Sequence, residues 1–232
     1  MFQILDIGNT HTRIANWDNG KFSDIEVVDT AELAAKGCDF LKHPAAAACV
    51  CREVRKQLDA CGINFISALN QKSQVDFSLV DCSTLGADRV ANAAALAEFY
   101  ELPGAVIDCG TAITLELVDS NKRFVGGAIA PGRALMRNGL ALGTSLLPKS
   151  GLLENIPDAP GRNTIDAIGF GVGRGVVGVV RELAMAAKEF LPLKTLILTG
   201  GDAEYFRKSL PEATVPGVEF TLHGVRLAAG IK

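Results

Sequence analysis

No stretch of this sequence stays apolar for long enough to cross a membrane. The longest apolar stretches, residues 44–51 and 175–180, fall far short of the roughly 18 residues that a spanning helix requires. The N-terminus has no basic segment before its apolar run, and Asp6 interrupts that run early, so we expect no secretory signal. The sequence therefore argues against a membrane protein and against a secreted one.

An excess of positive charge is also missing. The 232 residues include 23 Lys and Arg against 26 Asp and Glu, which gives a formal net charge of −3. Proteins that bind nucleic acid normally gather a basic excess on one face, so we expect no nucleic-acid partner. Hydrophobic residues make up 48% of the chain and charged residues 21%, which is typical of a folded globular protein and excludes a disordered one.

Cysteine is too sparse for a dense disulfide framework, and no two cysteines form a C-x-x-C pair. The cluster between Cys38 and Cys61 could hold a metal together with His43. We favour another interpretation, in which the cysteines are small buried hydrophobic residues in a reducing cytosol. A cytoplasmic protein is therefore expected. The six cysteines are Cys38, Cys49, Cys51, Cys61, Cys82 and Cys109.

Three segments at the start of the chain predict antiparallel strands. They are an apolar run at 2–7, an alternating stretch at 11–17 and a third segment at 21–28. Asn19-Gly20 separates the last two, and Asn-Gly between apolar runs is a strong hairpin signal. Further along, the pattern predicts helices and strands in alternation: helices at 31–36, 52–61 and 87–100, and strands at 46–50 and 64–66.

The pattern then restarts in the second half of the chain. Strands are predicted at 105–109, 113–118 and 124–130, followed by helices at 134–142 and 164–190. A strand at 195–198 and a helix at 203–210 come next. The last elements predicted are a short strand around Phe220 and a closing helix at 225–229. No motif role is assigned to the Gly-rich run at 169–178, which we expect to allow close helix packing near Thr164.

The two starts form an internal repeat. Residues 4–12 align with residues 106–114 at a constant offset of 102, and the alignment pairs Asp6 with Asp108 and Gly8 with Gly110. A repeat of this kind predicts the architecture of the whole chain. We expect an α/β fold of two similar domains, residues 1–102 and 103–232, with a cleft between them. Each should hold a mixed sheet of three antiparallel strands followed by alternating helices and strands.

The repeated Asp-x-Gly loops suggest phosphate binding. Glycine lets the backbone N–H groups of a tight turn approach phosphate oxygens, and the carboxylate can hold a cation that neutralises them. One such loop alone could be an ordinary hairpin turn, but two loops in register in a duplicated chain favour a nucleotide site. The Walker motif G-x-x-x-x-G-K-[ST] is absent, so a P-loop enzyme is not expected.

A second motif, Gly86-Ala87-Asp88-Arg89, opens the long Ala-rich helix predicted at 87–100. An Asp in the first turn could simply stabilise the helix dipole. An Arg at that end is disfavoured by the dipole, which indicates another task such as pairing with a carboxylate ligand. In phosphoryl transfer the attacking hydroxyl needs a base or an orienting group, and Asp88 is the candidate.

The facing Asp-Gly loops resemble those of the actin, sugar-kinase and heat-shock ATPase superfamily, whose domains have a duplicated ribonuclease-H-like fold. Within it, the chain resembles the type III pantothenate kinases over essentially its full length. Six segments carry this resemblance, in chain order: Asp6-Ile7-Gly8-Asn9-Thr10, Gly86-Ala87-Asp88-Arg89, Asp108-Cys109-Gly110-Thr111-Ala112, Gly126 to Gly132, Asn163-Thr164 with Ala167-Ile168, and Thr199-Gly200-Gly201.

The resemblance implies transfer of the ATP γ-phosphate to pantothenate, the first step of coenzyme A biosynthesis. It implies Asp88 as the proton acceptor, and a pantothenate site of Gly86, Ala87, Asp88, Arg89 and Thr164. Thr164 would come from the partner subunit of a homodimer. Asp6 would help to hold magnesium with ATP, and Asp108 would bind a monovalent cation, potassium or ammonium. The implied ATP-binding residues are Asp6, Ile7, Gly8, Asn9, Thr10, His11, Thr12, Arg13 and Thr111.

The chain departs from the family at one position. The family usually has a Tyr seven residues before Gly86, where this sequence has Leu79. Phe77 lies two residues earlier and is expected on the same strand face. Either Phe77 replaces the ring without its hydroxyl, or the chain does without this interaction with the substrate. Two alternative functions remain at this point: a transcriptional accessory factor on the same scaffold, and a related small-molecule kinase.

Overall fold

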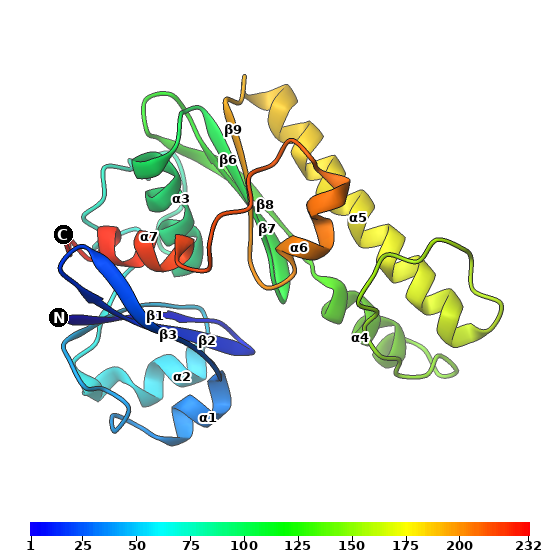
Figure 1. Cartoon of the computed structure of the whole chain (residues 1–232), viewed down its shortest axis with the longest axis horizontal. Coiled ribbons are helices and arrows are strands. Elements are labelled where there is room, and N and C mark those ends of the chain that lie inside the picture. Colours follow the sequence, from blue (N-terminus) through cyan, green and yellow to red (C-terminus); the bar gives the residue numbers. More distant parts are fainter. The chain divides into compact units, whose positions relative to one another are not determined.

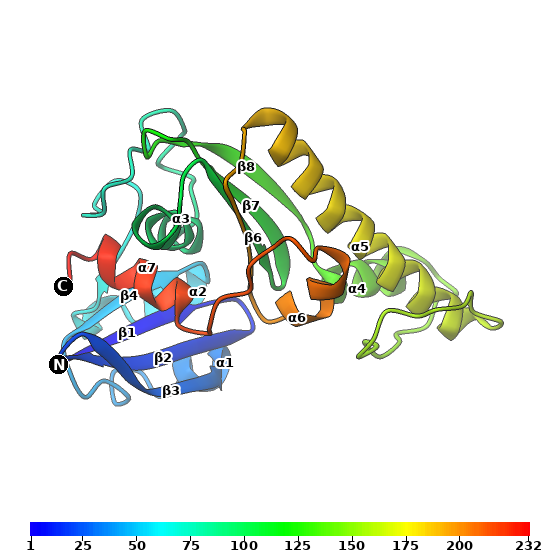
Figure 2. The same cartoon turned by 45° about the horizontal axis from the view of Figure 1, so that its top comes forward.

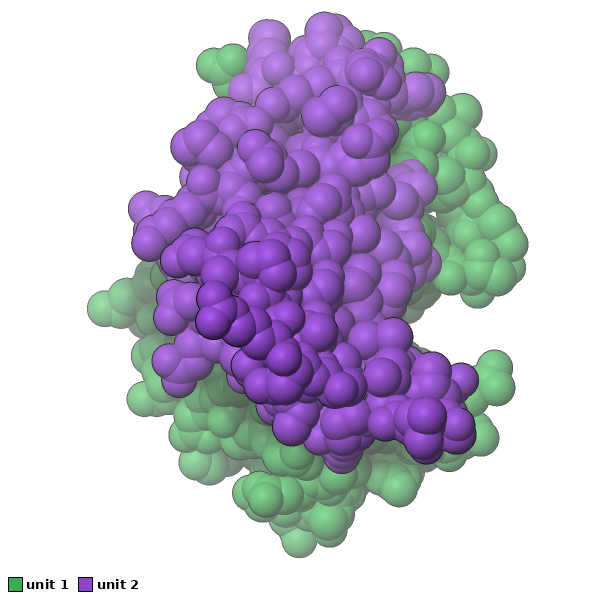
Figure 3. Space-filling view, turned by 90° about the vertical axis from the view of Figure 1, so that its right-hand side faces the viewer, with its two compact units in different colours: residues 1–104, 116–126, 217–232 green, residues 105–115, 127–216 purple.

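The computed structural model describes all 232 residues, and the chain divides into two compact units (Figure 3). The first unit comprises Met1–Gly104, Glu116–Gly126 and Gly217–Lys232, and the second comprises Ala105–Leu115 and Gly127–Pro216. The predicted domain limits at residues 102 and 103 stay a prediction. None of the helices is both long enough and apolar enough to span a membrane.

The first sheet contains five strands in the order β3-β2-β1-β4-β5. The strands β1 (Phe2–Ile7), β2 (His11–Asp18) and β3 (Lys21–Asp29) are antiparallel neighbours, whereas β4 (Ala45–Cys49) and β5 (Asn64–Phe65) run parallel to β1. The Asn19-Gly20 hairpin is confirmed. Both residues have positive φ, 49° and 81°, as its two-residue turn requires.

Helices cover both faces of this sheet. Helices α1 (Thr30–Ala35) and α2 (Arg52–Gln57) lie on one face and α3 (Ala87–Phe99) and α7 (Phe220–Ala228) on the other (Figures 1 and 2). A 3-10 turn, η1 (Asp59–Cys61), continues α2. Because β1 is covered on both sides, Ile4 and Leu5 are both fully buried although their side chains point to opposite faces.

The crossing of α3 and α7 is unusually close. A Cβ at Gly224 would lie 1.8 Å from the backbone oxygen of Ala91, so only glycine allows the two backbones to meet here. Beside this contact, the Thr221 hydroxyl lies 2.9 Å from the Asn92 side-chain oxygen, and both residues are buried. The predicted strand around Phe220 is therefore wrong, because Phe220 is the first residue of α7. Glycine in a helix is unfavourable alone, and tertiary packing overrides that preference.

The second sheet repeats the strand order of the first. It holds β6 (Gly104–Cys109), β7 (Ala112–Val118), β8 (Phe124–Pro131) and β9 (Thr195–Thr199), in the order β8-β7-β6-β9. This order matches β3-β2-β1-β4, and the ends of β6 lie 102 residues after those of β1. The prediction of two mixed sheets in a duplicated α/β fold is confirmed.

The second unit also contains the longest helix of the chain. Helix α4 (Arg133–Gly143) precedes α5 (Thr164–Phe190), and α6 (Ala203–Phe206) and the 3-10 turn η2 (Arg207–Ser209) follow β9. The segment between α4 and α5 packs against α5 at two glycines of the Gly-rich run. A Cβ would lie 2.9 Å from Leu153 at Gly169 and 2.8 Å from Pro157 at Gly173. These glycines therefore serve packing against a loop.

The structure corrects the interpretation of the cysteines. Cys38 and Cys61 form a disulfide with their Cα atoms 5.3 Å apart, and Cys38 is exposed. These two residues are thus not buried thiols, because the chain segment between them folds back and brings them together. Of the remaining cysteines only Cys109 is buried, and burial raises the pKa of the half-buried Cys49 thiol. No group of three His, Cys, Asp or Glu side chains that could hold a metal is present, so the alternative with His43 has no support.

The Gly224 contact yields a stability prediction. Gly224→Ala forces the α3 and α7 backbones apart, and such overpacking should lower the free energy of unfolding by about 1–3 kcal/mol. Urea unfolding monitored by circular dichroism measures this loss. Gly178→Ala is the control, because a Cβ there meets no atom within 4 Å and Ala favours the helix by up to about 1 kcal/mol. Equal stability of Gly224→Ala and the parent chain would contradict the account.

Candidate active site

The first Asp-x-Gly loop is a tight connection between β1 and β2. The backbone N–H of Gly8 donates to the His11 carbonyl over 3.1 Å, and a Cβ at Gly8 would lie 2.9 Å from that same oxygen. The backbone N–H of Thr30 donates to the Thr10 carbonyl over 3.0 Å. The loop therefore has a fixed shape, while the side chains of Asn9, Thr10 and His11 are exposed to solvent.

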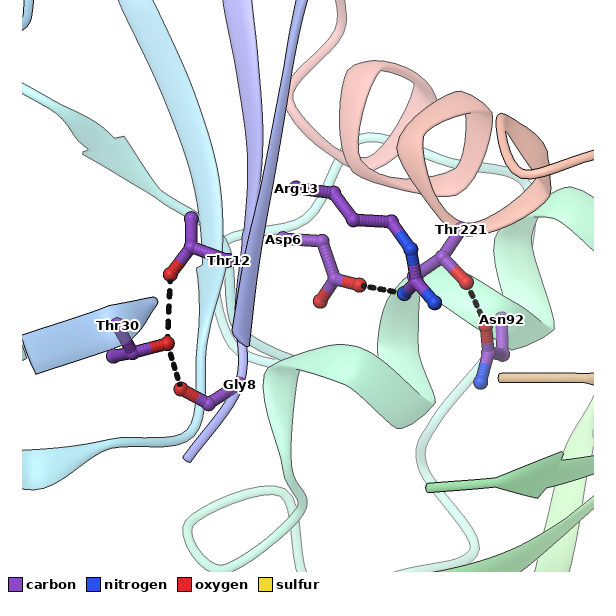
Figure 4. Close-up of polar contacts among 7 residues, drawn as sticks. All are labelled: Asp6, Gly8, Thr12, Arg13, Thr30, Asn92 and Thr221. Carbon is purple, nitrogen blue, oxygen red and sulfur yellow. Dashed lines mark hydrogen bonds and ion pairs between the residues drawn. The ribbon is translucent and has the colours of Figure 1, made fainter. Parts of the chain in front are cut away.

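Two threonines hold this loop from behind (Figure 4). The Thr30 hydroxyl donates to the Gly8 carbonyl over 3.0 Å and lies 3.0 Å from the Thr12 hydroxyl. Thr12 is fully buried and Thr30 nearly so. Of the residues predicted for ATP, Thr12 and Ile7 thus belong to the support of the loop, whereas residues 9–11 form its exposed edge.

Asp6 and Arg13 form an ion pair on the adjacent strands β1 and β2. They are register partners, and the Arg13 Nη1 atom lies 3.0 Å from the Asp6 carboxylate (Figure 4). Both side chains are mostly buried, which strengthens the pair relative to one in water. Magnesium prefers one or two carboxylates together with phosphate oxygens and water. The single carboxylate of Asp6 fits such a shared site, and no cage of several carboxylates is present.

Asp88 and Arg89 lie in the first turn of α3, as predicted. The Asp88 carboxylate accepts the backbone N–H of Arg89 over 2.8 Å. A Cβ at Gly86 would lie 2.6 Å from that carboxylate, so a larger residue at 86 would displace Asp88. The motif thus needs its glycine to leave room for the candidate base.

Arg89 makes a contact that the sequence analysis missed. Its Nε atom donates to Glu116 over 3.0 Å, and Glu116 on β7 is fully buried. Asn92, one turn further along α3, lies 3.5 Å from the other Glu116 oxygen. The available signal was a charged residue in the middle of an apolar strand, because such a residue must find a partner.

The second Asp-x-Gly loop, residues 108–111, is enclosed by two glycines of the second unit. Gly200 has φ +92°, and a Cβ there would lie 2.4 Å from the Asp108 carboxylate and 2.6 Å from the Cys109 carbonyl. A Cβ at Gly132 would lie 2.2 Å from the Gly110 carbonyl oxygen. The backbone N–H of Gly132 donates to the Thr111 carbonyl over 3.0 Å. Carboxylate and carbonyl oxygens are ligands that suit potassium, so this loop fits a monovalent cation chemically.

Thr164 is the first residue of α5 and is exposed. Asn163 caps this helix by accepting the Asp166 backbone N–H over 2.9 Å. The cap fixes the first residue of α5, and it therefore fixes the position of Thr164 at the N-terminus of that helix.

Phe77 and Leu79 do not share a strand face, so that expectation is wrong. They lie in a loop whose only sheet-like contact is an isolated bridge at Asp76. Leu79 is exposed, whereas Phe77 is buried with its ring 5.4 Å from that of Phe124. The Arg89 guanidinium lies 5.5 Å from the same Phe124 ring. Phe77 therefore packs against Phe124, whose ring in turn lies beside the Arg89 guanidinium.

A sequence model of the family described as type III pantothenate kinase matches residues 3–186, which include every predicted site residue. The chain belongs to the type III pantothenate kinase family. Type III pantothenate kinases of Akkermansia muciniphila and Kosmotoga olearia are 28% and 30% identical to it. The alignments cover 99% and 96% of this chain, and 98% and 93% of those relatives. Membership makes this chain an ATP-dependent kinase, as predicted, and does not favour a transcriptional role.

Solved structures support the fold. A putative Baf family transcriptional activator from Campylobacter jejuni has a TM-score of 0.64 at 22% identity, covering 97% of this chain and 95% of that one. The activator of 2-hydroxyisocaproyl-CoA dehydratase from Clostridium difficile, with bound ADPNP, has a TM-score of 0.56 at 13% identity, covering 97% and 92%. At these identities the likeness concerns the fold alone, and it agrees with the predicted duplicated α/β fold of two mixed sheets.

The glycine over Asp108 yields a prediction with a built-in control. Gly200→Ala adds a strained positive φ and a clash with the Asp108 carboxylate, which together should cost about 1–3 kcal/mol of stability. Gly201→Ala, one residue on, meets no atom within 4 Å and should change stability by less than about 0.5 kcal/mol. Thermal unfolding of both variants measures the difference, and equal melting temperatures would show that Gly200 does not confine Asp108.

Proposed function

We propose that this chain transfers the γ-phosphoryl group of ATP to the 4′-hydroxyl of pantothenate, giving 4′-phosphopantothenate and ADP, the first step of coenzyme A biosynthesis. The hydroxyl oxygen forms the new bond to phosphorus, the bond between the γ-phosphorus and the β,γ-bridging oxygen breaks, and the hydroxyl proton passes to a base. The observation that carries this proposal is the family match, because it spans both Asp-x-Gly loops, the Gly86–Arg89 motif and Thr164.

On the substrate side, Asp88 is the proposed base and Arg89 the proposed partner of the pantothenate carboxylate. Gly86 and Ala87 complete the pantothenate site at the start of α3. The backbone N–H groups in the first turn of a helix lack intrahelical partners and attract anions, which supports binding of a carboxylate there. Guanidinium is also the side chain best suited to a planar carboxylate.

On the nucleotide side, Asp6, Gly8 to His11 and Arg13 are proposed to bind ATP, together with Thr111 of the second loop. Ile7 and Thr12, which are fully buried, are proposed to contribute by supporting the loop. Magnesium bound by Asp6 and the phosphates would neutralise negative charge that develops during transfer. The fixed shape of the loop at Gly8 supports this role, because a preorganised loop needs no rearrangement when the phosphates bind. Asp108 is proposed to hold potassium or ammonium with nearby carbonyl oxygens.

A homodimer is proposed on the evidence of an exposed apolar surface. Helix α4 buries none of its residues, and large apolar side chains are exposed along it and up to the start of α5. Thr164, which the partner subunit is proposed to supply to the pantothenate site, is exposed and lies at the end of this stretch of chain. The exposed residues are Leu135, Leu140, Leu142, Leu146, Leu152, Leu153 and Ile165. A cytoplasmic location, with no membrane or nucleic-acid partner, completes the proposal; it does not rest on the cysteines, because Cys38 and Cys61 form a disulfide.

The reaction is tested by a coupled kinase assay. Purified chain with magnesium, ATP and pantothenate should form 4′-phosphopantothenate, and potassium or ammonium should stimulate it relative to sodium. Asp88→Asn should lower kcat by about 10²–10⁴-fold, the usual contribution of a general base, while the KM for ATP changes little. No product under any of these cation conditions would refute the substrate, and full activity of Asp88→Asn would remove Asp88 from the base role.

The shared site is tested by complementation. Asp88→Asn and Thr164→Ala homodimers should each have low activity. A heterodimer made by co-expressing the two variants contains one site with both native residues, if Thr164 acts across the interface. Activity should therefore rise well above that of either parent. Activity no higher than the average of the two homodimers would mean that Thr164 acts within its own subunit, or not at all.

A further inference from the structure

A buried polar cluster links the start of α3 to β7 and α7 within the first unit. It consists of Arg89, Asn92, Glu116 and Thr221. We propose that Glu116 is a positioning residue, which fixes the orientation of the Arg89 guanidinium for the carboxylate of the substrate. This inference rests on the function proposed above, since it concerns how Arg89 recognises that carboxylate.

The burial of Glu116 is the first reason. Glu116 is 0% exposed and lies on β7 between Leu115 and Leu117, which are buried as well. Burying a carboxylate costs several kcal/mol unless charged and hydrogen-bonding partners compensate it. A leucine or valine at this position would avoid that cost. The Arg89 guanidinium, 3.0 Å away, supplies the compensating positive charge. Because separating the two would leave Glu116 buried and uncompensated, the pair is strongly favoured.

The geometry of the contact is the second reason. The guanidinium of arginine is planar, and its five N–H groups form a rigid fork. The bond runs from Nε, the atom next to the aliphatic part of the side chain. Fixing Nε fixes the plane in which the two terminal nitrogens lie. The Phe124 ring, 5.5 Å from the guanidinium carbon, limits its movement further.

The support of Glu116 itself is the third reason. Asn92 lies one turn after Arg89 on α3, and its side-chain nitrogen lies 3.5 Å from the second Glu116 oxygen. The Asn92 oxygen in turn accepts the hydroxyl of Thr221 on α7 over 2.9 Å (Figure 4). Asn92 is 0% exposed, and Thr221 is buried as well. Because α7 contacts α3 closely at Gly224, the cluster connects the arginine to the packed interface of these two helices.

A neighbouring ion pair shows what a purely local role looks like. The Arg123 Nη2 atom lies 2.7 Å from the Asp119 carboxylate, and the two residues are separated by only four positions in the chain. Asp119 also accepts the backbone N–H groups of Asn121 and Arg123, so this pair closes the turn between β7 and β8. Glu116 differs because its partner is 27 residues away and follows the candidate base Asp88 directly.

The experiment compares two substrates that differ only in the recognised group. Pantothenate carries the carboxylate, and its alcohol analogue pantothenol carries a hydroxymethyl group instead. Glu116→Gln should raise the KM for pantothenate about tenfold, the size of a typical coupling between contacting residues, with little change in the KM for ATP. The KM for pantothenol, or its inhibition constant if it is not phosphorylated, should stay close to that of the parent chain. Glu116→Asp keeps the charge and should show a smaller effect of the same kind.

Asp119→Asn is the matched control, because it disrupts another carboxylate–arginine pair of the same unit, in which the carboxylate is nearly buried. It should alter thermal stability without changing the ratio of the two KM values. The inference is overturned if the Glu116 variants affect pantothenate and pantothenol equally, if they affect neither, or if neither variant folds, since Glu116 would then be a purely structural residue. Failure of the proposed function is recognised separately, because the parent chain would then form no product from pantothenate.

Discussion

The close crossing of α3 and α7 is the contact on which the first unit depends. Only a glycine at 224 lets α7 approach the Ala91 carbonyl, and this approach places Thr221 against Asn92 in the buried interior. Through this contact the C-terminal helix becomes part of the unit that contains the N-terminal sheet. Helix α3 is buried at most positions from Ala87 to Ala97, so tertiary packing fixes the start of the helix, with Asp88 and Arg89, in addition to local helix propensity.

The same use of glycine recurs at both Asp-x-Gly loops. Gly8 and Gly200 are each required by an identified oxygen atom of the protein: the His11 carbonyl and the Asp108 carboxylate. At these two positions glycine is therefore required by contacts within the protein and not only by room for a ligand. A loop shaped by its own close contacts is preorganised, and preorganised donors and charges are what phosphoryl transfer requires.

Local pattern was enough to predict much of the fold. The limits of β1 and α5 agree with the sequence prediction, because strong apolar periodicity and a cap at Asn163 mark them. The repeat at an offset of 102 anticipated the matching strand orders. Local pattern failed where distant residues decide the outcome. A short strand was predicted around Phe220, where α7 in fact begins and packs on α3 at Gly224, and the Phe77 ring packs on that of Phe124, 47 residues later.

For the candidate site, sequence motifs identified the candidate residues Asp6, Asp88, Arg89 and Asp108. They did not identify the residues that contact them, since pairs such as Arg89 and Glu116 are brought together only by folding.

The most direct test of the account is a crystal structure of the chain with pantothenate bound. The account predicts that Arg89 contacts the pantothenate carboxylate through its terminal nitrogens while its Nε atom stays bonded to Glu116. A carboxylate bound elsewhere, or an Arg89 released from Glu116 on binding, would contradict it.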